Sequence, residues 1–125
     1  MPFDGTEYHD DPEISLEEKA LRHALAFFSD ESKWMRGDAG SLKEGRMCVG
    51  MALVTGGLLA RPLNDAGRLF VDQALGVSRA ANWNDTCPDF KTMKAHLETR
   101  IAFYQQKRLA NSYIVVIGPG RQVRT

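Results

Sequence analysis

The sequence contains little cysteine and little histidine, and this scarcity excludes several classes of protein. Only two cysteines, Cys48 and Cys87, occur among 125 residues. That is too few for a disulfide-stabilised secreted scaffold, so both are expected to be free thiols. The three histidines, His9, His23 and His96, are widely scattered. Because no pair of these residues has the spacing of zinc ligands, the sequence predicts no metal site, and it indicates no cofactor.

Long apolar runs and an excess of charge of one sign are also missing. The apolar runs are far shorter than the roughly 20 residues that span a bilayer. The segment from Met1 to Asp11 is acidic and polar, unlike a signal peptide. A cytoplasmic protein without membrane contact is therefore expected. Lys plus Arg number 16, as do Asp plus Glu. A nucleic-acid binder usually carries a basic excess, so nucleic acid is not an expected partner.

Hydrophobic residues make up 43% of the chain, which is enough to build the core of one domain. The first helix should begin at Ser15, because Ser15 and Glu18 form a capping-box pattern. The second helix is expected over Arg46–Leu59. Its residues leave almost no polar face, and a helix that is apolar all round belongs in the centre of a domain.

Two further helices follow. The third starts near Pro62 and ends at Gly76, a residue suited to a left-handed cap. After a connector, Thr86 and Asp89 resemble another capping box, and the fourth helix should reach about Arg108. The predicted fold is mainly α, a compact bundle of about four helices around a buried central helix.

The last part of the chain predicts something different. Tyr113–Ile117 is a β-branched run closed by Gly118, Pro119 and Gly120, which is typical of a strand. The expected organisation is therefore a flexible arm at 1–14, a helical domain at 15–110 and a strand-like tail at 111–125. No second strand is evident, so the tail is expected to pair with the arm, with a protein partner or with a second copy of the chain, or else to pack as an extended tail.

Three short motifs lie along the chain: a tryptophan-glycine loop, a run close to Gly-Arg-x-Cys-x-x-Gly-Ala-Leu, and Trp-Asn-Asp before a last helix. The residues concerned are Trp34, Gly37, Gly45, Arg46, Cys48, Gly50, Ala52, Leu53, Trp83, Asn84 and Asp85, with Met51 near the place of the expected small residue. Together they resemble a family of small uncharacterised helical proteins of actinobacteria and phages. The resemblance implies a helical fold and, by analogy, a phage or mobile-element accessory role that interferes with a host.

Cys48 is the first candidate functional residue. In the first turn of a helix, exposed amides would favour its thiolate, with His96 or His23 as a base and Asp85 to orient that base. A small cysteine-dependent hydrolase or transferase is the function this arrangement would support. The alternative is that Cys48 is a small buried apolar residue, as free cysteines commonly are.

The other candidates are binding residues. Trp34, Arg46 and the run Trp83, Asn84 and Asp85 could grip a ligand or a partner. They could instead form a structural clamp in which Trp83 is buried and Asp85 pairs with Arg46. Since the sequence contains no complete catalytic constellation, the expected function is that of a small non-enzymatic binding or interaction protein.

Overall fold

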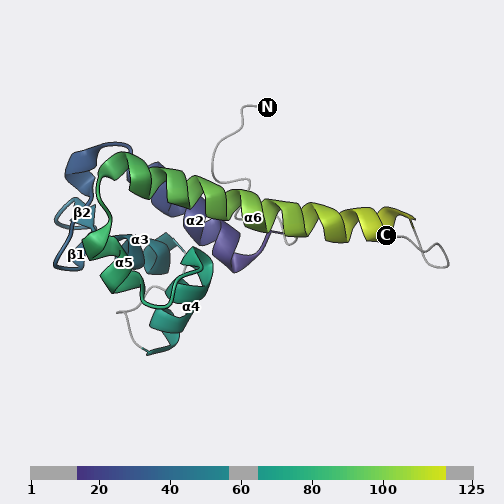
Figure 1. The fold of residues 1–125 in the computed structure, drawn as a ribbon, viewed down its shortest axis with the longest axis horizontal. Helices are drawn as coiled ribbons and strands as arrows, with labels where there is room; N and C mark the ends of the chain where they lie inside the picture. The colour runs from purple at the N-terminus through teal and green to yellow at the C-terminus, as the bar shows by residue number, and fades with distance from the viewer. Residues whose placement is uncertain (1–13, 57–64, 118–125) are drawn as a thin grey trace.

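The computed structural model describes residues 14–56 and 65–117, and the side chains of 14–55 and 65–110 (Figure 1). The arm expected at 1–14 lies outside this part of the chain, apart from Ile14. The elements in chain order are α2 (Leu16–Phe27), the 3-10 turn η1 (Glu31–Lys33), β1 (Gly40–Ser41), β2 (Arg46–Met47), α3 (Val49–Gly56), α4 (Asp65–Leu75), α5 (Ala80–Thr86) and α6 (Phe90–Ile117).

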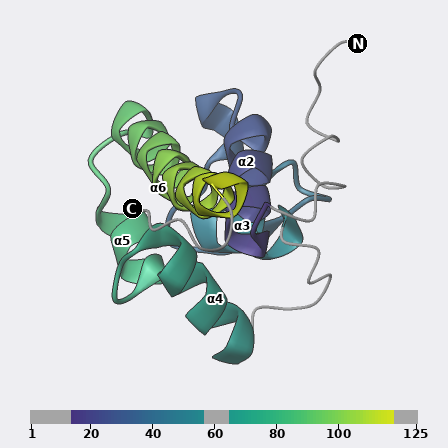
Figure 2. The same cartoon turned by 90° about the vertical axis from the view of Figure 1, so that its right-hand side faces the viewer.

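The helices pack around α3. Helix α3 contacts α2, α4 and α5, while α2 lies between α3 and the long helix α6. Figure 2 looks along α6 and shows α2 beside it, with α4 and α5 together on the lower side. Val49, Leu53 and Val54 of α3 are almost completely buried. The prediction of a mainly helical fold around a central apolar helix is confirmed.

The start of the central helix was predicted three residues too early. Arg46 and Met47 are not helical but form β2, which pairs antiparallel with β1 in the register Gly40 to Met47 and Ser41 to Arg46. Gly45 has a φ of +78°, a left-handed conformation that closes the turn between the two strands. Helix α3 therefore begins only after this hairpin, and the residues expected at its end, 57–59, lie outside the described part.

At the start of α2, the predicted capping box is half right. Ser15 is the N-cap, and its Oγ accepts a hydrogen bond of 3.1 Å from the amide of Glu18. The Glu18 carboxylate does not reach back to Ser15. It is fully buried, and it pairs with Arg22 at 2.9 Å and with Arg108 of α6 at 3.3 Å. This ion-paired carboxylate joins α2 to α6 through the interior.

Side chains of α6 also hold the end of α4. Gly76 has a φ of +69°, as its predicted role as a cap requires, and the amides of Gly76 and Val77 both donate to Asp72 O. The last carbonyls of α4 accept from α6: His96 Nε2 lies 2.8 Å from Leu75 O, Arg100 Nε 2.9 Å from Ala74 O, and Tyr104 Oη 3.1 Å from Gln73 O. His96 and Arg100 therefore dock α6 on α4.

Two elements differ from the prediction after α4. The connector expected before Cys87 contains α5, and Thr86 Oγ1 donates to Asn82 O at the end of that helix. The N-cap of α6 is Asp89 alone, since its Oδ1 accepts from Thr92 N at 2.7 Å.

The predicted C-terminal strand is wrong. The backbone of Tyr113–Ile117 forms the last turns of α6, which continues past the rest of the domain (Figure 1). The β-branched residues favour a strand only weakly, whereas continuing an existing helix needs no new nucleus.

Substitution of Gly76 tests the cap of α4. A Cβ at this residue would lie 2.7 Å from the Arg100 guanidinium, while a Cβ at Gly37, with a φ of +82°, would meet nothing. We expect Gly37→Ala to cost about 1–2 kcal/mol of unfolding free energy, the usual cost of left-handed backbone. Gly76→Ala should cost more, because it also displaces Arg100 from its carbonyls. Urea denaturation of both variants measures the difference, and equal losses would contradict the packing described.

Candidate functional site

The side chain of Asn84 is the centre of a buried cluster of hydrogen bonds. It is 1% exposed. Its Oδ1 accepts from Trp34 Nε1 at 2.8 Å and from Val49 N at 3.0 Å. Its Nδ2 donates to Met35 O at 3.0 Å. One amide therefore joins α5, the start of α3 and the loop that follows η1, and it does so with its hydrogen-bonding groups satisfied.

Residues near Asn84 form further contacts that hold the loop after η1 in place. Asp85 Oδ1 accepts from Gly37 N at 2.8 Å. The Arg36 guanidinium lies over the Trp34 ring at 4.6 Å and donates to Cys87 O at 2.7 Å. Trp34 and Asn84 are thus engaged in holding the loop to α5, which supports the structural interpretation of these residues over the ligand-gripping one.

The predicted pairing of Arg46 with Asp85 is wrong. Arg46 is exposed in β2, and it forms no ion pair with any residue that the structure describes. The physical reason is the hairpin, which carries Arg46 outside the helix start where the pairing was expected. Trp83 is half-buried, and its ring lies 4.8 Å from that of His96. The bonded cluster therefore differs from the predicted clamp: it has Asn84 and Trp34 at its centre and does not include Arg46.

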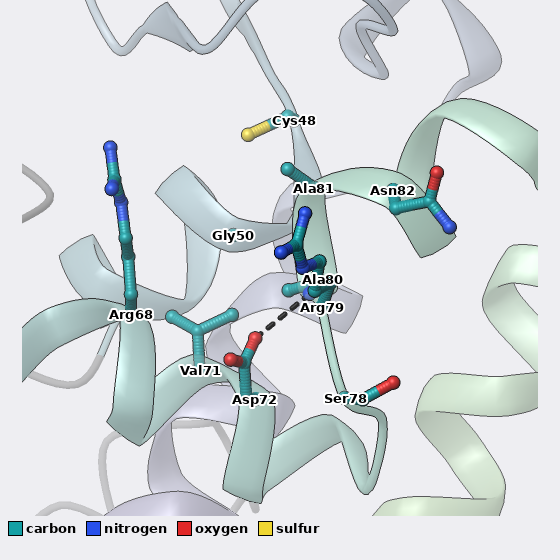
Figure 3. Close-up of a pocket in the computed structure, with 10 residues that line it drawn as sticks. All are labelled: Cys48, Gly50, Arg68, Val71, Asp72, Ser78, Arg79, Ala80, Ala81 and Asn82. Carbon is teal, nitrogen blue, oxygen red and sulfur yellow. Dashed lines mark hydrogen bonds between the residues drawn. The ribbon is translucent and has the colours of Figure 1, made fainter. Parts of the chain in front are cut away.

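A pocket of about 590 Å³ lies beside this cluster, between α3, α4 and α5. Figure 3 shows the residues that line it, which are Cys48, Gly50, Arg68, Val71, Asp72, Ser78, Arg79, Ala80, Ala81 and Asn82. Asp72 Oδ1 accepts from Ala80 N at 2.8 Å and so fixes the start of α5 against α4. Of the predicted candidates, only Cys48 lines this pocket.

Cys48 precedes α3 and acts as its cap. Its Sγ accepts from Met51 N at 3.3 Å, and its carbonyl accepts from Ala52 N at 3.0 Å. Burial raises the pKa of the Cys48 thiol, and the nearby Asp85 carboxylate acts in the same direction, although the amides of Met51 and Gly50 oppose both. The thiol is therefore held in its protonated form at neutral pH.

The structure does not bring the proposed catalytic residues together. His96 contacts Leu75 O and the Trp83 ring, and it does not line the pocket that Cys48 lines. Asp85 is bonded to Gly37 N rather than to a histidine. Cys48 thus has no histidine beside it among the residues described at the pocket, and burial shifts its thiol pKa away from that of an activated nucleophile.

Sequence reasoning missed Arg68 and Arg79, which belong to no motif. Arg68 lies in α4, and Arg79 is the residue before α5. Nothing in their local sequence indicates that they line the same cavity, because only the packing of α4 against α5 brings them there. Asn84 was recognised through the Trp-Asn-Asp run, but its partner Trp34 lies 50 residues away.

Searches for other kinds of site give negative results in the described part of the chain. No group of three or more His, Cys, Asp or Glu side chains there could hold a metal ion. No described helix is both long and apolar enough to cross a membrane. Comparison of the chain with family models, with curated proteins and with solved structures gives no match. The family resemblance noted above stays a prediction.

The Asn84 cluster leads to a stability prediction with a control in the same helix. Asn84→Ala leaves Trp34 Nε1, Val49 N and Met35 O without their partner. An unsatisfied buried group costs about 1–3 kcal/mol, so we expect a loss of at least 3 kcal/mol in unfolding free energy. The exposed Asn82, replaced by alanine, should cost under about 0.5 kcal/mol. Chemical denaturation compares the two. A loss for Asn84→Ala as small as that for Asn82→Ala would contradict the role of the cluster.

Proposed function

We propose that this chain is a small non-enzymatic binding protein whose ligand occupies the pocket between α3, α4 and α5. The observation that carries the proposal is the pocket itself, with a volume of about 590 Å³ and walls supplied by three helices. Ligand pockets commonly have volumes of about 300–1,000 Å³. The Asn84 cluster supports the proposal, because it fixes α5 against α3 and so holds two walls of the pocket in place.

The thiol of Cys48 supports a binding role rather than a catalytic one. Cys48 lines the pocket but is occupied as the cap of α3, and burial raises its thiol pKa. A nucleophile needs the opposite shift or an adjacent base. The cysteine-dependent alternative is therefore less well supported than ligand binding.

A pair of tryptophan variants tests the binding proposal. Ala81 lines the pocket, whereas Ala102 is exposed on α6 away from it. A library of small-molecule fragments, some charged and some neutral, is screened by NMR. At least one fragment should shift the amide resonances of Gly50 and Val71 in the parent protein. Ala81→Trp, which fills the pocket, should abolish these shifts, and Ala102→Trp should leave them unchanged. If no fragment moves the pocket resonances, or if the shifts survive in Ala81→Trp, the pocket is not a ligand site.

The end of α6 supports a second interaction, which we propose to be self-association. Arg108 joins α6 to Glu18 of α2, and the backbone of the helix continues to Ile117. That extension spans about 13 Å at 1.5 Å per residue. Its last five residues, Tyr113–Ile117, carry no charge. A helical run that is apolar all round requires cover, and a second copy related by a twofold axis supplies an identical run.

Light scattering tests self-association. We expect the parent to have the mass of a dimer, and a chain ending at Ala110 to have that of a monomer. The double variant Val115→Glu, Val116→Lys keeps the chain length and should also be a monomer, because each charge would be buried in the interface. A monomeric parent, or variants that remain dimers, would contradict the proposal.

A further inference from the structure

The arginines of the described chain fall into two groups. Arg22 and Arg108 pair with Glu18, while Arg36 and Arg100 donate to backbone carbonyls. The guanidinium groups of the remaining three, Arg46, Arg68 and Arg79, donate to no acceptor in the part of the chain that the structure describes.

Two of these three arginines line the same pocket. Arg68 and Arg79 approach it from α4 and from the residue before α5. In Figure 3 both side chains extend toward the end of the pocket where Cys48 lies. Both residues are exposed at the pocket, and an anion between them would be attracted by two positive charges. Their planar donor groups also match the geometry of carboxylate and phosphate oxygens.

The charges of the residues that line the pocket leave it positive, while Asp85, whose carboxylate acts on the Cys48 thiol, lies outside the lining. Asp72 is the acidic residue of the lining, and one of its oxygens is already bonded to Ala80 N. Its single charge offsets one of the two guanidinium charges. Cys48 adds no negative charge at neutral pH, because burial raises its thiol pKa. The lining therefore has a formal excess of one positive charge.

Two of the first-turn amides of α3 are not available to hold a ligand. Val49 N donates to Asn84 Oδ1, and Met51 N donates to Cys48 Sγ. Binding of an anion would thus depend on the two arginines. The rest of the lining includes Val71, Ala80 and Ala81, which offer apolar surface to the body of a ligand.

From these contacts we infer that the pocket binds a small organic anion, with a carboxylate or phosphate group between Arg68 and Arg79 and an apolar part against Val71 and Ala81. The inference rests on the proposed function, since it names the ligand class of the same pocket. It also makes a stricter claim than ligand binding does. The affinity must depend on the negative charge of the ligand and on these two arginines.

Three probes of similar shape test this requirement. Phenyl phosphate, benzoate and benzyl alcohol are titrated into the full chain, and Kd is obtained from the amide shifts of Gly50 and Val71. At least one of the two anions should bind about tenfold tighter than the neutral alcohol, since one charge-assisted interaction of about 1.4 kcal/mol corresponds to a factor of ten. Comparison of the two anions shows whether phosphate or carboxylate is preferred.

Arginine variants provide the matched control. Arg68→Ala and Arg79→Ala should each weaken binding of the preferred anion about tenfold. Arg46→Ala removes the same charge from an exposed arginine outside the pocket and should leave Kd unchanged. Because no described hydrogen bond involves the side chain of any of the three, all should melt like the parent, and thermal unfolding checks this before binding is compared.

The outcomes separate this inference from the proposed function. If benzyl alcohol binds as tightly as the anions, or if Arg46→Ala weakens anion binding as much as Arg68→Ala does, the anion site is wrong while the pocket remains a ligand site. If neither anion moves the pocket resonances, the inference is also wrong. The fragment screen with Ala81→Trp then decides independently whether the pocket binds a ligand of another class.

Discussion

The buried carboxamide of Asn84 is the interaction on which the arrangement of this protein depends. It accepts from an indole and from the first amide of α3, and it donates to a loop carbonyl. These groups belong to segments that share no ladder of backbone hydrogen bonds with α5. A buried polar network of this kind is favourable only when every member is satisfied, so it specifies one position of α5 relative to α3. Replacement by a residue of other shape or polarity would leave several groups unpaired at once.

The pocket follows from that constraint. Helix α5 has only seven residues, and a helix of this length is not stable by itself. It is held at its start by Asp72, which accepts from Ala80 N, and along its length by Asn84. With α5 fixed in this way, Arg79 faces the same cavity as Arg68 of α4. The network that stabilises the fold therefore also sets the spacing of the charges that would hold a ligand.

Much of the helical framework could be predicted from the sequence, because its signals are local. Ser15 and Gly76 mark a helix start and a helix end through short-range hydrogen bonds, and α3 is apolar on all faces. The C-terminal strand was predicted wrongly because the local preference for a strand was overridden by the continuing helix. Tyr113–Ile117 has β-branched residues, yet it continues a long helix. The pocket could not be predicted, since Arg68 and Arg79 meet only through the packing of two helices.

Hydrogen exchange of the two indole groups tests the role of Asn84 most directly. Trp34 Nε1–H is bonded to Asn84 in a buried site, while Trp83 is half-buried against His96. If the network holds the fold together, the Trp34 indole proton should exchange only when the whole domain unfolds, with a free energy equal to that from denaturation. The Trp83 indole proton should exchange by smaller openings. Exchange of the Trp34 indole as rapid as that of Trp83 would contradict the central role of Asn84.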